Sequence, residues 1–192
     1  MQVTTLKFKI VMTKKLIPLL FVIAILFQGC KGDDGAPGVD GGTVLGTTFD
    51  LTKVNFTAAN KYVTSYTFAA TSPNVKVLES DLVLIYVYWG EDVLGNALDA
   101  WRLMPQTTYD TGLGALIYNF DRTATDFSIF LDGNVDYTKL PASFTQNQTF
   151  RVVIIPSDFN SRKSGTVDYS DYEAVKKFYN IDESKIAKYP AK

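Results

Sequence analysis

Apolar and polar positions alternate along much of the chain between residues 48 and 155. In Leu116–Asp121 and Phe127–Leu131 apolar side chains stand at alternate positions, which is typical of strands with one buried face. Leu82–Trp89 is apolar throughout and predicts a central strand that is buried on both faces. Further strands are expected at Thr48–Thr57, Tyr62–Ala69, Ala100–Met104 and Phe150–Ile155. About seven strands separated by turn residues predict a β-sandwich.

The pattern changes to a helical period near the end of the chain. Apolar side chains recur at helical spacing from Tyr172 to Tyr179, and Ser170 with Glu173 forms a capping-box pattern. We expect a helix of about ten residues that starts near Asp171, and another short helical turn within Asp182–Ala187. The expected fold of residues 47–192 is therefore all-β: an immunoglobulin-like or related sandwich of about seven strands with a short C-terminal helix.

Residues 1–29 have the order of a secretory signal peptide. Lys14 and Lys15 precede an apolar run of 12 residues, Leu16–Phe27, and Gly29 supplies the small residue before the cleavage site. The run is shorter than the roughly 20 residues that a transmembrane helix needs. Translation from either Met1 or Met12 would include this signal.

Cys30 is the only cysteine in the chain, and Phe27-Gln28-Gly29-Cys30 resembles a lipobox. We expect Cys30 to be lipidated and to anchor the mature protein stably, because several acyl chains would be attached. Lys31, Asp33 and Asp34 follow and resemble the short signal that exports lipoproteins of the Bacteroidota to the outer face of the outer membrane. Acidic residues are also common in any solvated tether.

Glycine occupies every third position from Gly32 to Gly41, the period of a collagen strand. Three triplets are too few for a triple helix alone, so residues 30–46 are expected to form an extended spacer. A short trimerisation segment is the alternative.

Composition excludes several functions. The chain has no histidine, and its one cysteine is expected to carry lipid, which excludes Ser-His-Asp and Cys-His nucleophilic sites and zinc bound by His and Cys. Residues 1–29 hold four of the 19 basic residues and none of the 20 acidic ones, so the mature chain has a net charge of about −5. This balance argues against nucleic acid as a partner. We expect no cofactor.

Two weak motifs have chemical meaning. Asp132, Asn134 and Asp136 have the spacing of the first half of a calcium loop, but Tyr137 stands where that loop needs glycine. A turn between strands is the alternative interpretation. Five acids flank the central strand and offer carboxylates for a glycosidase, although their spacing pairs no two of them: Glu79, Asp81, Glu91, Asp92 and Asp99.

The aromatic residues suggest a ligand site. Trp89 and Trp101 bracket the loop after the central strand, and exposed rings there would stack on sugars. Packing in the sandwich core is the alternative for both.

Three segments together resemble small collagen-like surface lipoproteins of flavobacteria and other Bacteroidota: Trp101–Thr107, Phe130–Asn134 and Gln146–Val153. That family has no assigned activity, so the resemblance implies no functional residues. We expect a non-enzymatic lipoprotein, lipid-anchored on the cell surface, that binds a protein or serves as an accessory subunit of an outer-membrane complex. The alternative is a glycan-binding module.

Overall fold

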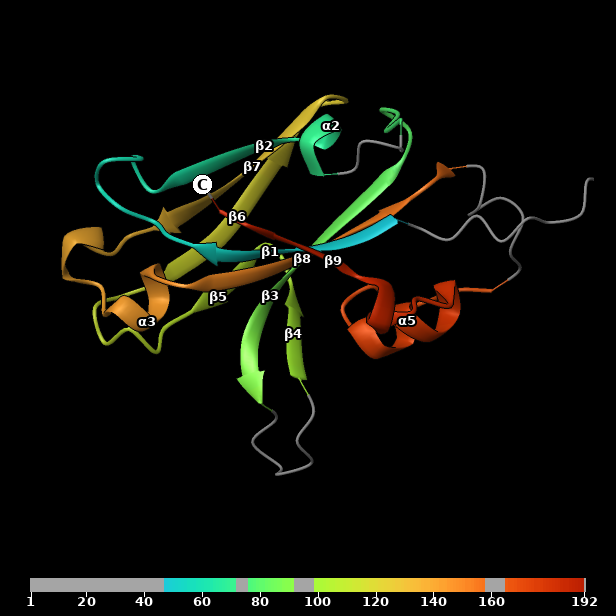
Figure 1. Ribbon diagram of the computed structural model, residues 1–192. Helices are drawn as coiled ribbons and strands as arrows, with labels where there is room; N and C mark the ends of the chain where they lie inside the picture. Colours follow the sequence, from blue (N-terminus) through green and yellow to red (C-terminus); the bar gives the residue numbers. More distant parts are fainter. Residues whose placement is uncertain (1–46, 72–75, 92–98, 158–164, 192) are drawn as a thin grey trace, which may run out of the picture. The chain divides into compact units, whose positions relative to one another are not determined.

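The computed structural model describes residues 47–71, 76–91, 99–157 and 165–191 (Figure 1). The predicted signal peptide, Cys30 and the tether as far as residue 46 lie outside these ranges.

Nine strands in the described ranges form two sheets. The first sheet, sheet A, has the order β4-β3-β8-β1-β9. Its strands are β4 (Asp99–Leu103), β3 (Leu82–Glu91), β8 (Gln148–Ile155), β1 (Thr47–Val54) and β9 (Ala187–Pro190). Neighbouring strands are antiparallel except for β9, which pairs in parallel with β1.

The second sheet, sheet B, is antiparallel and has the order β2-β7-β6-β5. Its strands are β2 (Val63–Thr67), β7 (Asp126–Gly133), β6 (Leu116–Arg122) and β5 (Gln106–Thr108). The predicted all-β sandwich is therefore confirmed. All seven expected strands are present, and β5 and β9 are additional.

The main core lies between the two sheets. Alternate side chains of β1 and β8 point into it, so that Phe49 and Leu51 are almost fully buried there together with Phe150 and Val152. Sheet B contributes residues such as Ile129 to the same core. Burying each side chain of this size stabilises the fold by roughly 1.5–3 kcal/mol, which makes this core the principal source of stability.

A second, smaller core covers the opposite face of sheet A. Helix α5 (Tyr172–Tyr179) buries Tyr172, Val175 and Tyr179 against a cluster that includes Leu84 and Tyr86 of β3. Strand β3 is apolar on both faces because the main core covers one and α5 covers the other.

The ends of α5 are capped by side chain and backbone. Asp171 is the N-cap, and its carboxylate accepts a hydrogen bond from the Ala174 N–H. The expected cap, Ser170, instead donates its hydroxyl to Asp168 at 2.7 Å. At the other end Asn180 adopts the left-handed conformation, with φ of 54°. The helix is therefore eight residues long and starts where the sequence predicted.

Four short helical turns complete the described elements: α2 (Phe68–Thr71), η1 (Tyr137–Lys139), α3 (Ala142–Thr145) and η2 (Glu183–Lys185). The last of these is the short turn expected within Asp182–Ala187. Within the described ranges, no helix combines the length and hydrophobicity needed to cross a membrane.

Candidate functional site

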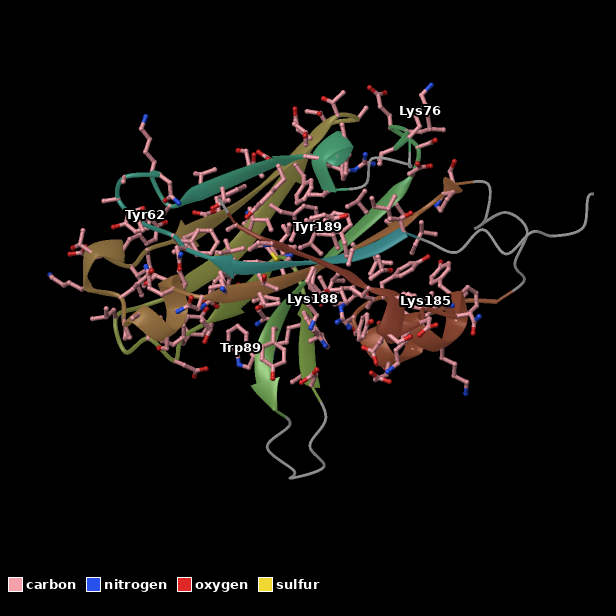
Figure 2. The ribbon with its side chains drawn as sticks, in the orientation of Figure 1. Tyr62, Lys76, Trp89, Lys185, Lys188 and Tyr189 are labelled. Atoms are coloured by element: carbon pink, nitrogen blue, oxygen red, sulfur yellow. The ribbon has the colours of Figure 1, made fainter. Side chains whose placement is uncertain are left out.

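Trp89 and Trp101 lie on opposite faces of the β3–β4 hairpin. Trp101 pairs across the strands with Tyr88, and the two rings are 5.3 Å apart on the face beneath α5. Trp89, one residue further along β3, packs instead against the main core (Figure 2). The structure thus does not bring the two tryptophans together, and each has to be judged in its own surroundings.

Trp89 borders a hollow of about 230 Å³, here called the Trp89 hollow. It is lined by Tyr88, Trp89, Asp110, Tyr118, Ser143, Phe144 and Gln148. Four of these residues are aromatic, while Asp110, Ser143 and Gln148 supply polar groups. The hollow is smaller than the pockets of about 300–1,000 Å³ that hold drug-sized ligands, so it fits one sugar ring or one side chain.

The floor of the Trp89 hollow is held by hydrogen bonds. The Tyr118 hydroxyl donates to the carbonyl of Phe144 at 2.7 Å, and burial raises the pKa of this phenol. The Gln148 amide donates to the carbonyls of Ser143 and Gln146 at 2.9 and 2.8 Å. These bonds tie α3 to β6 and β8, so the hollow is shaped before any ligand arrives.

The Trp89 indole is itself fixed between two side chains. The guanidinium carbon of Arg102 lies 4.3 Å from the ring centroid, a cation–π geometry. The Tyr118 ring meets Trp89 edge-to-face, with 6.1 Å between centroids. Trp89 is therefore a preorganised aromatic wall.

The loop between β5 and β6, which contributes Asp110 to this hollow, also exposes two large side chains, Tyr109 and Leu113, here called the rim. Tyr109 is 73% exposed and Leu113 is 44% exposed. The loop is ordered by local bonds: the Thr108 hydroxyl donates to Asp110 at 2.9 Å, and the Leu113 N–H donates to the Thr111 hydroxyl at 3.1 Å. Two large apolar side chains are thus presented to solvent on a fixed loop, next to Asp110 of the hollow.

A buried ion pair on the other face of sheet A was not predicted from the sequence. Asp50 of β1 and Arg151 of β8 are register partners and are only 3% and 6% exposed. The Arg151 guanidinium donates two hydrogen bonds to the Asp50 carboxylate, at 2.8 and 3.0 Å. The available signal was a charged residue between two apolar neighbours in each strand: Asp50 follows Phe49, and Arg151 follows Phe150.

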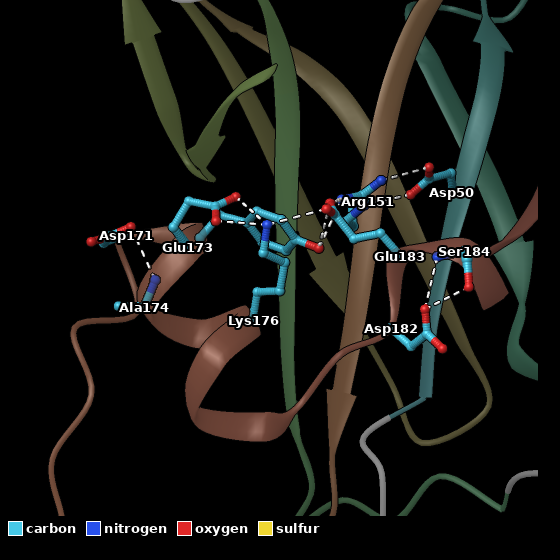
Figure 3. Close-up of polar contacts among 10 residues, drawn as sticks. Asp50, Arg151, Asp171, Glu173, Ala174, Lys176, Asp182, Glu183 and Ser184 are labelled. Atoms are coloured by element: carbon cyan, nitrogen blue, oxygen red, sulfur yellow. Dashed lines mark hydrogen bonds and ion pairs between the residues drawn. The ribbon is translucent and has the colours of Figure 1, made fainter. Parts of the chain in front are cut away.

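Arg151 also links sheet A to the C-terminal segment (Figure 3). It donates to the Tyr172 hydroxyl and to Glu183, each at 2.7 Å, and Lys176 bridges Glu183 to Glu173. Burial tends to lower the pKa of Arg151, but the bonds to Asp50 and Glu183 raise it overall, so the guanidinium stays charged. This cluster of Asp50, Arg151, Tyr172, Lys176 and Glu183, here called the clamp, ties the C-terminal segment with α5 and η2 to sheet A.

Beside the clamp lies a second hollow of about 270 Å³, here called the Trp101 hollow. It lies between β4 and the start of α5 and is lined by Asp99, Ala100, Trp101, Ser170, Asp171, Tyr172 and Glu173. Trp101 and Tyr172 also contact the Arg151 guanidinium, with its carbon 4.1 and 4.9 Å from the ring centroids. Trp101 thus belongs both to the clamp and to the hollow.

The side chains of the three residues in the calcium motif each accept a separate hydrogen bond from a backbone N–H group. Asp132 accepts from the Gly133 N–H, Asn134 accepts from the Ala115 N–H, and Asp136 caps η1. Among the described residues, no three His, Cys, Asp or Glu side chains are grouped so that they would hold a metal ion. The motif therefore acts as a turn and a helix cap here.

Two of the acids flanking β3, Asp81 and Asp99, form structural hydrogen bonds, while Glu79 is exposed. Asp81 is buried, and its carboxylate accepts from the N–H groups of Leu78 and Ser157. Asp99 accepts from the Tyr88 hydroxyl at 3.1 Å. Asp92 and the side chain of Glu91 lie outside the described part of the structure.

No family model, curated protein or solved structure matches this chain. The resemblance to collagen-like surface lipoproteins therefore stays a prediction. The same is true of the roles of Cys30, Lys31, Asp33 and Asp34, which lie outside the described residues.

Proposed function

We propose that this protein is a non-enzymatic lipoprotein, anchored through Cys30 to the outer face of the outer membrane, whose sandwich binds a partner protein of an outer-membrane complex. The observation that carries the binding role is the exposure of Tyr109 and Leu113 on the loop that contributes Asp110 to the Trp89 hollow. Aromatic side chains next to a preformed socket are typical of the few residues that dominate protein interfaces.

The lipid anchor strengthens this role. A protein confined to a membrane meets its neighbours at a high effective concentration, so even a small contact surface suffices for association. The sequence also has no histidine, and its one cysteine, Cys30, would carry lipid in this proposal, so the residues on which many catalytic sites depend would be missing.

Mutation of the rim tests the proposal. Leu113→Ser should abolish recovery of a stoichiometric partner when the tagged lipoprotein is purified from gently solubilised membranes. Leu78→Ser is the matched control, because Leu78 is 45% exposed and Leu113 is 44% exposed. Equal recovery with both variants would rule out the rim as the contact surface.

The second candidate function is glycan binding in the Trp89 hollow. Its specific support is the combination of aromatic walls with the carboxylate of Asp110 and the amide of Gln148, which suit sugar hydroxyls. Titration with a polysaccharide panel, monitored by tryptophan fluorescence, tests it. A polysaccharide that changes the fluorescence of the wild type should no longer change that of Asp110→Asn. No fluorescence response to any polysaccharide would exclude this function.

The proposed lipid anchor and surface location are tested by separate experiments. Cys30→Ala should move the protein from the membrane fraction to the soluble fraction, and unchanged retention would show that lipid on Cys30 is not the anchor. Replacing Lys31, Asp33 and Asp34 by alanine should leave the protein in the membrane but protect it from protease added to whole cells. Continued cleavage of the variant would show that these residues are not the export signal.

A further inference from the structure

The Trp101 hollow combines aromatic walls with exposed carboxylates. Trp101 and Tyr172 form the aromatic part, and Asp99, Asp171 and Glu173 supply the acids. No basic side chain is among the residues that line it. Asp99 and Asp171 each hold one local donor, namely the Tyr88 hydroxyl and the Ala174 N–H.

The charges around this hollow do not balance. Arg151 is matched by Asp50 and Glu183, while Lys176 pairs with Glu173 and Glu183. Within the described ranges, no basic side chain forms an ion pair with Asp99 or Asp171, so their carboxylates add negative charge to the lining of the hollow. The described acids are not grouped to hold a metal ion, and the aromatic walls beside the carboxylates suit an organic cation better.

Trp101 and Tyr172 already contact one organic cation, the guanidinium of Arg151. Arg151 lies over both Trp101 and Tyr172 at cation–π distances. Tyr88 packs against Trp101, and Tyr86 packs against Tyr172, each with 5.3 Å between ring centroids. The electron-rich rings and the neighbouring carboxylates together favour a second guanidinium or ammonium group in the hollow.

We propose that the Trp101 hollow binds an arginine or lysine side chain of the partner protein. This inference rests on the proposed function, because it names the chemistry of a partner residue. The hollow is nevertheless a separate contact from the rim of Tyr109 and Leu113, and it lies on the opposite face of the β3–β4 hairpin.

The two tryptophans permit a direct test on the full-length protein labelled with ¹⁵N. Each indole N–H gives one resonance, and Trp89→Phe identifies which belongs to Trp101. The probe is Nα-acetyl-arginine methylamide, with the citrulline analogue as a neutral compound of the same shape. The arginine probe should shift the Trp101 resonance in a saturable way and leave Trp89 in place, while citrulline should have no effect.

A charge-neutralising variant completes the test. Asp99→Asn with Asp171→Asn should weaken binding of the arginine probe about tenfold, which corresponds to about 1.4 kcal/mol. Asparagine still accepts the Tyr88 bond and still caps a helix, so the fold is retained. Asp110→Asn, in the Trp89 hollow, is the matched control and should bind normally.

Three results would overturn the proposal: no shift of Trp101 with the arginine probe, an equal shift with citrulline, or unchanged binding in the double variant. A shift of Trp101 by methyl glycosides but not by arginine would identify a sugar site instead. Because the probe is a small molecule, these outcomes are independent of whether Leu113→Ser loses a protein partner.

Discussion

At the scale of single residues, two tyrosines differ in whether the buried hydroxyl has a partner. The Tyr66 ring stacks on Phe127 with 5.4 Å between centroids, but its hydroxyl oxygen is buried without a hydrogen-bond partner among the described residues. The Tyr118 hydroxyl donates to the Phe144 carbonyl at 2.7 Å. A buried polar group without a partner costs about 1–3 kcal/mol, whereas a hydrogen bond contributes about 0.5–1.5 kcal/mol.

Replacing each tyrosine by phenylalanine should therefore change stability in opposite directions. Tyr66→Phe keeps the stacked ring and removes the hydroxyl, so the free energy of unfolding should rise by about 1 kcal/mol. Tyr118→Phe leaves the Phe144 carbonyl without its donor and should lower it by about 1–2 kcal/mol. Urea unfolding measures both, and destabilisation of both variants to the same extent would contradict this assignment.

At the scale of elements, the Asp50–Arg151 pair couples the C-terminal segment to sheet A. Asp50→Asn removes one charge and leaves the Arg151 guanidinium buried with a weaker partner. Breaking a buried pair in this way costs about 3–5 kcal/mol. Since Arg151 keeps Glu183 and Tyr172, we expect a loss near the lower end of that range in urea unfolding.

The matched control is a solvent-exposed pair with a similar separation. Lys139 and Asp136 are 3.2 Å apart, with side chains 70% and 47% exposed. Lys139→Ala should lower the free energy of unfolding by less than about 1 kcal/mol. Equal effects of Lys139→Ala and Asp50→Asn would show that burial does not make the Asp50–Arg151 pair special.

The stability that the clamp contributes should depend on pH through Glu183. Burial tends to raise the pKa of Glu183, but hydrogen bonds from Lys176 and Arg151 outweigh it and hold the pKa below its usual value of 4.5. A depressed folded-state pKa stabilises the protein above the unfolded pKa, and that contribution is lost as pH falls through the folded pKa.

Glu183→Gln should therefore be less stable than the wild type at neutral pH, and the difference should shrink as pH falls below about 4.5. Urea midpoints from pH 3 to 7 measure it, with the exposed Glu79→Gln as control. A difference that stays constant with pH would show that the Glu183 charge does not matter to the clamp.

The sequence predicted those elements whose pattern is local. Strand β3 is a continuous apolar run and helix α5 has a helical period, and both were found at the expected places. Strands β5 and β9 were missed because they have only three and four residues, and β9 depends on pairing with β1, which is far away in the chain.

Sites that depend on strand register could not be predicted from the sequence. Trp89 and Trp101 bracket one loop, which made a shared ligand site one interpretation and core packing the other. Register places Trp101 opposite Tyr88 and so puts the tryptophans on different faces. Register also pairs Asp50 with Arg151, which are separated by 101 positions. No local pattern carries that information.

At the scale of the whole molecule, buried tyrosines determine the response to alkali. Burial raises the pKa of Tyr66 to about 12 and raises the pKa values of Tyr86, Tyr118 and Tyr172 further. A folded-state pKa raised above the unfolded value of about 10 gives stability that is fully present below pH 10. That stability is lost as pH rises through the folded pKa. The chain has no histidine, so no imidazole titrates near neutrality.

We therefore expect the urea midpoint to be nearly constant from about pH 6 to 9 and to fall steeply above about pH 10. The urea midpoint of Tyr66→Phe should fall less steeply above pH 10, because this variant has one buried phenol fewer. Tyr109→Phe is the control, since Tyr109 is 73% exposed and its replacement should leave the alkaline slope unchanged. A marked change of stability between pH 6 and 8 would instead require a titrating group other than these phenols, and would contradict the view that the buried tyrosines set the pH range of this fold.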